Sequence, residues 1–134
     1  MNLNDCKSIG GLMEAAVKVL NFSLEEIKQL FPEQEISERY YYSTENEKEK
    51  VVEIKFGDVT LTCFFNNQKN VCDFSNLYPY TTDEIEAWIS YCNDNYVYSD
   101  EHNAWKFGEN YIKMQKEACD IYLMFLPGDR INEN

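Results

Sequence analysis

Basic residues are scarce in this chain. Its 12 lysine and arginine residues stand against 24 aspartate and glutamate residues, which gives a formal net charge of −12 at pH 7. Proteins that bind nucleic acid neutralise phosphates with surplus lysine and arginine, and anionic membrane surfaces attract the same side chains. The composition therefore argues against nucleic acid and against a membrane surface as partners.

Long apolar runs are also absent. The first five residues carry no positive charge, and Glu14 and Lys18 interrupt the first apolar stretch. A secretory signal needs a basic start and an uninterrupted apolar segment, and a membrane span needs about 20 apolar residues. We therefore expect neither, and we expect a cytoplasmic protein.

The cysteines do not form a disulfide framework. They are five in number, which leaves one unpaired, and no two are spaced as C-x-x-C. In a reducing compartment such residues are small, soft core side chains. We expect free thiols at Cys6, Cys63, Cys72, Cys92 and Cys119.

Motifs that carry chemistry are missing as well. Gly10 and Gly11 have no phosphate-loop or dinucleotide spacing, and His102 is the only histidine. His102 follows Asp100 and Glu101 in a polar turn, where consecutive residues need not converge on a metal or a proton. Pairing His102 with a cysteine nucleophile is weaker still, because Cys72 and Cys92 lie in apolar patterns where thiols are inert. We expect no catalytic residue, no cofactor and no metal.

What the sequence does contain is enough apolar material for one core. The chain has 134 residues, 44% of them hydrophobic, with no repeat and no linker. That length corresponds to one domain, 1–134, which can bury most of its surface without disulfide bonds or a structural metal ion. Residues 128–134, after Pro127, look like a frayed tail.

The first third of the chain has helical periodicity. Six apolar residues recur at spacings of three and four, namely Ile9, Leu12, Met13, Ala16, Val19 and Leu20. Ser23 and Glu26 then form a capping-box pattern that opens a short second helix, which Pro32 closes. One unbroken helix is the alternative, because the apolar period continues through Asn21.

A β-hairpin is the clearest element of the chain. After a strand-like segment at 39–43 and a charged loop at 45–49, apolar residues alternate with polar ones on both sides of Gly57-Asp58. A two-residue turn there places Phe56 opposite Val59, Ile54 opposite Leu61 and Val52 opposite Cys63. One face of the hairpin is then wholly apolar.

The second half continues with mixed elements. We predict a short strand at 71–74, a loop at 75–80, a capped helix at 82–93, and strand-like segments at 96–98 and 104–107. Residues 111–116 and 121–126 fit a last hairpin better than a helix, because apolar residues alternate with polar ones in the first segment. Hairpins without crossovers predict the α+β class, with an antiparallel sheet and two or three helices on one of its faces.

The tyrosine content is the one feature that exceeds what an ordinary small domain contains. The chain has ten tyrosines, and several stand beside acidic residues at the two ends of the predicted 82–93 helix. Tyrosine offers a large, rigid contact area with a polar tip, and interfaces are enriched in it. The predicted partner-binding residues are Tyr80, Asp83, Glu84, Asp94, Tyr96, Tyr98, Asp100 and Glu101.

These features predict a non-catalytic acidic binding protein with a basic protein partner. The physical type is that of an immunity protein or antitoxin, whose carboxylates meet the basic surface of a nuclease-like toxin domain. The alternative is a small enzyme or ligand-binding domain with a pocket between the sheet and the 82–93 helix, using Trp88 and Trp105. A subunit of a larger assembly is a third possibility.

Overall fold

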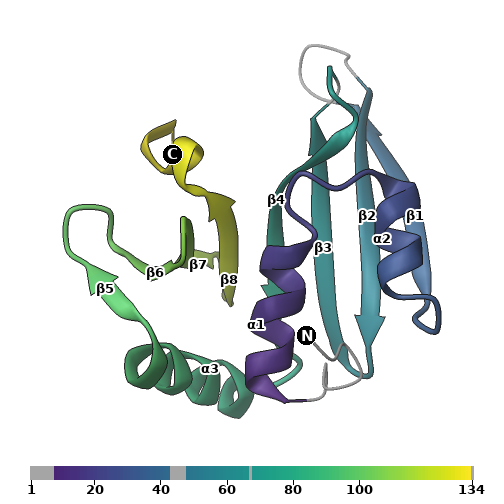
Figure 1. Ribbon diagram of the computed structural model, residues 1–134. Coiled ribbons are helices and arrows are strands. Elements are labelled where there is room, and N and C mark those ends of the chain that lie inside the picture. The colour runs from purple at the N-terminus through teal and green to yellow at the C-terminus, as the bar shows by residue number, and fades with distance from the viewer. Residues whose placement is uncertain (1–7, 43–47, 67, 134) are drawn as a thin grey trace.

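The computed structural model describes residues 8–42, 48–66 and 68–133. Within these ranges, three α-helices and a short 3₁₀-helix accompany one eight-stranded sheet (Figure 1). The elements are α1 (Ile9–Lys18), α2 (Leu24–Leu30), β1 (Ile36–Tyr42), β2 (Lys48–Phe56), β3 (Val59–Asn66), β4 (Val71–Tyr78), α3 (Thr82–Asn95), β5 (Val97–Ser99), β6 (Ala104–Phe107), β7 (Asn110–Glu117), β8 (Asp120–Pro127) and η2 (Gly128–Glu133). The predicted α+β class is confirmed.

The sheet consists of two four-stranded meanders joined in the middle. Its strand order is β1-β2-β3-β4-β8-β7-β6-β5, and every neighbouring pair is antiparallel. Figure 1 shows α1 in front of the junction where β4 lies beside β8. A long-range pairing between residues 75–77 and 123–125 therefore joins the two meanders into one open sheet.

The predicted hairpin is confirmed in its register. Phe56 pairs with Val59, Ile54 with Leu61, and Val52 with Cys63. Residues paired across an antiparallel sheet share a face, so Leu77 and Leu123 continue the row that Ile54 and Leu61 begin. All four side chains are fully buried, and this row is the floor of the main core.

The sequence predicted two or three helices on one face of the sheet, but the helical segments of the structure are divided between its two faces. Buried residues of α1, α2 and α3, such as Leu12, Ile27 and Trp88, share the main core with the row described above. The C-terminal residues instead form η2, whose buried Ile131 packs with Ala104 and Leu126. Leu126 is offset by an odd number of residues from Leu123, so this second cluster lies on the opposite face.

The N-terminal helical segment is two helices rather than one. Asn21 adopts a left-handed conformation with φ 68°, which ends the helical path. Ser23 and Glu26 then form the predicted capping box at the start of α2. The intervening backbone pairs with β4, because the Asn21 N–H donates to the Cys72 carbonyl oxygen and the Cys72 N–H donates to the carbonyl oxygen of Phe22.

The predicted loop at residues 75–80 is wrong for its first half. β4 continues through Ser75 and Asn76 to Tyr78, and both polar residues are buried. The Ser75 hydroxyl donates to the carbonyl oxygen of Ala16 at 2.8 Å. That oxygen belongs to the last turn of α1, where carbonyl groups lack helical partners, so a polar side chain is well placed in the core. The charged loop predicted at 45–49 falls mostly on residues 43–47, outside the described ranges.

The start of η2 offers a direct test of how the C-terminal segment is held. A Cβ atom at Gly128 would lie 2.3 Å from the Glu109 carbonyl oxygen, which belongs to the backbone. We expect Gly128→Ala to lower the free energy of unfolding by about 1–3 kcal/mol in urea denaturation, as overpacking does. Asp129→Ala, at the next and exposed position, should change it by less than about 0.5 kcal/mol. Equal stability of the two variants would contradict this close approach.

Candidate binding surface

α3 positions most of the predicted site residues. The Thr81 hydroxyl oxygen accepts a hydrogen bond from the Glu84 N–H at 3.2 Å, and the Glu84 carboxylate accepts from the Thr81 N–H at 3.0 Å. This capping box confirms the predicted start of the helix. Ile85, Trp88 and Cys92 form its buried face, so the acidic residues of α3 face outward.

The predicted residues separate into two groups. α3 has 14 residues, so its ends lie on the order of 20 Å apart. Tyr80, Asp83 and Glu84 stand at its start. The other five, Asp94, Tyr96, Tyr98, Asp100 and Glu101, stand at its end and along β5 and the turn after it.

At the start of α3 the predicted residues differ in their availability. Tyr80 is 69% exposed, and Asp83 is exposed too. The Glu84 carboxylate, however, accepts hydrogen bonds from the backbone N–H groups of both Tyr80 (2.7 Å) and Thr81 (3.0 Å). The Glu84 carboxylate therefore caps the start of α3, whereas the side chains of Tyr80 and Asp83 are exposed.

At the end of α3 the two tyrosines have different roles. Tyr96 is partly buried, with its ring 5.9 Å from that of Tyr91 and 5.0 Å from that of Phe107. Burial raises the pKa of its hydroxyl. Tyr98 is 46% exposed and lies edge-on to buried Trp105, with 5.5 Å between the ring centres. Of these two tyrosines, Tyr98 is thus the exposed one.

Trp105 supports this surface from beneath. Its indole Nε1–H donates to the Asn93 Oδ1 at 3.0 Å, which ties β6 to the last turn of α3. Val97, beside Tyr98 on the edge strand β5, is 72% exposed. Because successive strand residues point to opposite faces, Val97 lies beside Lys106 on one face and Tyr98 beside Trp105 on the other. The fixed Trp105 and the exposed Tyr98 therefore give a preformed aromatic contact area.

Charge on this part of the chain has a single sign. No lysine or arginine lies between Lys69 and Lys106, a segment that spans β4, α3 and β5. Asp94, Asp100 and Glu101 are all exposed within it. We call Asp94, Tyr98, Asp100 and Glu101 the β5 patch. Lys106 pairs with Val97 across the β5–β6 ladder, so both of these side chains lie on the face opposite to Tyr98.

The residues considered for catalysis do not converge. The His102 ring lies 5.1 Å from that of Tyr111, and its Nε2 is 3.9 Å from the Glu101 carboxylate. Cys72 and Cys92 are fully buried, and burial raises the pKa of the Cys92 thiol to about 12. Such thiols are poor nucleophiles. Within the described ranges, no three histidine, cysteine, aspartate or glutamate side chains are grouped as metal ligands.

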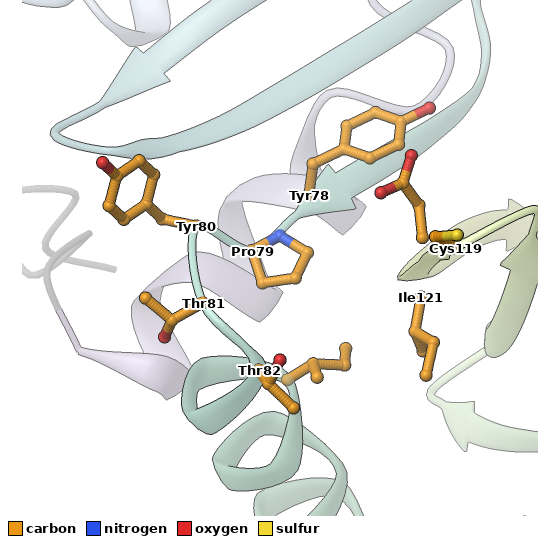
Figure 2. Close-up of a pocket in the computed structure, with 9 residues that line it drawn as sticks. Tyr78, Pro79, Tyr80, Thr81, Thr82, Cys119 and Ile121 are labelled. Carbon is orange, nitrogen blue, oxygen red and sulfur yellow. The ribbon is translucent and has the colours of Figure 1, made fainter.

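Two cavities border α3. The first, of about 340 Å³, lies between the start of the helix and the β7–β8 turn, and Figure 2 shows the residues around it. The second, of about 310 Å³, lies between α1, the β2–β3 turn and the side of α3 that carries Trp88. Trp105, predicted to line a pocket with Trp88, lines neither of these two.

The first cavity includes residues that the sequence did not single out. Cys119 comes from the β7–β8 turn, and Asp120 and Ile121 begin β8. Figure 2 shows Cys119 and Ile121 across from Pro79 and Thr82. The pairing of β4 with β8 brings these two segments together. No local pattern in the sequence indicates that pairing.

Comparison of the chain with protein-family models, with curated proteins and with solved structures gives no match. In the described part of the chain, none of the helices has the length and apolar composition to cross a bilayer.

The turn beside the first cavity contains a strained residue. Ala118 has φ +54°, a left-handed conformation that costs an alanine about 1 kcal/mol or more. We expect Ala118→Gly to raise the free energy of unfolding by about 0.5–1 kcal/mol. Gly57→Ala is the reverse control, because Gly57 has φ +64° with open space around it, and it should destabilise by a similar amount. Loss of stability in Ala118→Gly would contradict the assigned conformation.

The cysteines give a second test. Cys63, Cys72 and Cys92 are buried, whereas Cys119 is exposed. In native protein isolated without reductant, we expect a thiol reagent to modify Cys119 quickly and the three buried thiols only as fast as the protein unfolds. After denaturation all five cysteines of the chain should react. Fewer than five free thiols would contradict the expectation of a reducing compartment.

Proposed function

We propose that this chain is a non-catalytic acidic binding protein that inhibits a basic protein partner, as an immunity protein or antitoxin does. The observation that carries this proposal is that no lysine or arginine lies between Lys69 and Lys106, whereas Asp83, Asp94, Asp100 and Glu101 within that segment are exposed. Exposed carboxylates on such a surface repel acidic partners and accelerate the encounter with basic ones.

A nuclease-like toxin is the kind of partner that this charge suits best. Proteins that cleave nucleic acid present lysine and arginine side chains to phosphates. On the β5 patch, Asp94, Asp100 and Glu101 offer carboxylates to the same side chains. A partner held in this way could not bind its nucleic acid at the same time.

The apolar part of the patch provides affinity in addition to charge. Exposed charge pairs contribute little each, about 0–1 kcal/mol, whereas buried aromatic side chains dominate most interfaces. Tyr98 is exposed within the patch, and buried Trp105 lies behind it. We therefore assign recognition to the carboxylates and most of the binding energy to Tyr98.

Affinity capture from source cells with a charge-matched control tests the proposal. Asp94→Asn, Asp100→Asn and Glu101→Gln together remove three negative charges from the β5 patch. Glu25→Gln, Glu33→Gln and Glu35→Gln remove three from exposed positions on and after α2. We expect wild type and the α2 control to capture the same basic protein at low salt, and the patch variant to lose it.

The captured protein must also be inhibited. If it cleaves nucleic acid and wild type abolishes that cleavage, the proposal holds. A captured protein that is not basic, equal capture by both triple variants, or capture without inhibition of any activity would overturn it.

A ligand-binding domain is the second candidate, because a cavity lies between the start of α3 and β8. Native mass spectrometry of the purified protein tests it. A small molecule that co-purifies at one per chain and is lost when Thr82, an exposed residue of the cavity wall, is changed to tryptophan would favour this function instead.

A further inference from the structure

The cavity at the start of α3 is built from three segments that the fold brings together. Its nine lining residues are Tyr78, Pro79, Tyr80, Thr81, Thr82, Ile85, Cys119, Asp120 and Ile121. Its volume of about 340 Å³ is near the lower limit for ligand pockets, which is enough for one large side chain rather than for a cofactor. Its residues belong to the end of β4, the start of α3, and the β7–β8 turn with the start of β8 (Figure 2).

The walls of this cavity combine polar side chains, such as Thr81 and Thr82, with aliphatic and aromatic ones. Ile85 and Ile121 give aliphatic surface, and Tyr78 gives an aromatic ring. The Tyr78 ring is held in place, because it packs on Tyr122 at 4.9 Å and its hydroxyl accepts a hydrogen bond from the Asn76 side chain at 2.9 Å. A wall of this kind suits the aliphatic stem and planar head of a long cationic side chain.

Charge at the cavity is negative. Asp120 is the one charged residue among the nine that line it. A helix start usually favours anions, but here the Glu84 carboxylate already accepts the Tyr80 and Thr81 N–H groups. The negative charge near the cavity also acts on the Tyr78 hydroxyl. Burial is the largest cause that raises its pKa, the charges of Glu117 and Asp120 raise it further, and the Asn76 hydrogen bond lowers it. An anionic occupant would meet Asp120 with no basic lining residue to offset it.

We propose that this cavity receives an arginine side chain of the basic partner, with the guanidinium against Tyr78 and paired with the Asp120 carboxylate. This inference rests on the proposed function. Arginine fits better than lysine because its planar guanidinium stacks on aromatic rings and pairs with both oxygens of a carboxylate. The cavity and the β5 patch lie at opposite ends of α3, on the order of 20 Å apart. A standard interface, on the order of 30 Å across, covers both.

Cys119 provides a probe of the cavity that does not need the partner. An exposed thiol at the cavity wall exchanges with small disulfides, and the equilibrium amount of each mixed disulfide reports how well its fragment is held there. The fragments are those of guanidinoethyl disulfide, cystamine, mercaptoethanol disulfide and dithiodiglycolate. All proteins carry Cys6→Ser, so that this second thiol does not compete.

We expect the guanidinoethyl fragment to be favoured over the neutral hydroxyethyl fragment about fivefold at Cys119, cystamine less so, and the anionic fragment least. Asp120→Asn should reduce the guanidinium preference to about twofold or less. The control for the general negative field is Ser90→Cys in a Cys119→Ser background. Ser90 is exposed on α3 between Glu86 and Asp94, one turn away on either side, but lines neither cavity described above.

The outcomes separate this inference from the proposed function. A guanidinium preference equal to that at the Ser90→Cys site, or unchanged by Asp120→Asn, would overturn the arginine site. If a basic partner is captured and inhibited but binds Asp120→Asn as well as wild type, the arginine site is wrong while the proposed function stands. If the preference depends on Asp120 and no basic partner is found, the cavity binds guanidinium groups and the proposed function is wrong.

Discussion

A protein carrying Leu61→Asp is expected not to fold. Leu61 is fully buried in the centre of β3, between Ile54 on β2 and Leu77 on β4. Removing a buried leucine side chain costs about 2–5 kcal/mol, and an unpaired carboxylate at that position adds several more. The sum approaches or exceeds the whole stability of an ordinary domain, about 5–15 kcal/mol. Circular dichroism should show neither a native spectrum nor a cooperative melting transition.

The matched control is Thr60→Asp on the same strand. Thr60 points to the other face of the sheet, is only partly buried, and accepts a hydrogen bond from the Lys55 ammonium group at 3.1 Å. An aspartate there keeps a cation beside it, so we expect a change in stability within about 1 kcal/mol. Cooperative melting of Leu61→Asp near the wild-type temperature would show that Leu61 does not face the core.

The hairpin around Gly57 was predictable because its information is local. Strict alternation on both sides of a two-residue turn fixes which residues face each other, and a slip of one position would expose every apolar side chain. The same reasoning explains why the hairpin of β7 and β8 was correctly preferred to a helix. The capping boxes at Ser23 and Thr81 are local too, since each involves residues three positions apart.

The elements that were mispredicted depend on distant partners. Ser75 and Asn76 resemble loop residues because they are polar, yet they lie at the centre of the sheet. Their burial is possible because Ala16, 59 residues away, and Tyr78 provide hydrogen-bond partners. The C-terminal residues look like a frayed tail in the sequence, since nothing near them shows that Ile131 packs with Ala104. Contacts between residues so far apart in the chain leave no local pattern from which a single sequence could predict them.

The candidate site shows the same division. Acid and tyrosine at the two ends of α3 are visible in the sequence, but their spatial grouping is not. The fold places Tyr96, the C-cap of α3, in an aromatic cluster and leaves Tyr98, on β5, exposed. The sequence does not show this difference, because it depends on the residues packed around each ring. Asp120 joins the start of α3 only because β4 pairs with β8. The arginine site therefore depends on topology rather than on any motif.

Truncation of Tyr98 is expected to cause the largest loss of partner binding. Tyr98→Ala should cost about 2 kcal/mol or more, roughly a thirtyfold increase in Kd, mostly through faster dissociation. The reason is that its ring is exposed within the β5 patch and backed by a buried tryptophan. Binding kinetics with the captured basic partner, measured at low and high salt, provide the test.

Two further variants show whether the loss of binding in Tyr98→Ala reflects contact at that position, rather than the charge of the patch or the removal of any exposed tyrosine. Asp100→Asn removes one peripheral carboxylate, so it should mainly slow association and weaken its dependence on salt. Tyr41→Ala removes the same side chain from the opposite edge of the sheet, where Tyr41 is 52% exposed on β1. It should leave binding unchanged. If Tyr41→Ala weakens binding as much as Tyr98→Ala, the interface lies at the β1 edge, and binding that strengthens with salt would exclude an acidic surface altogether.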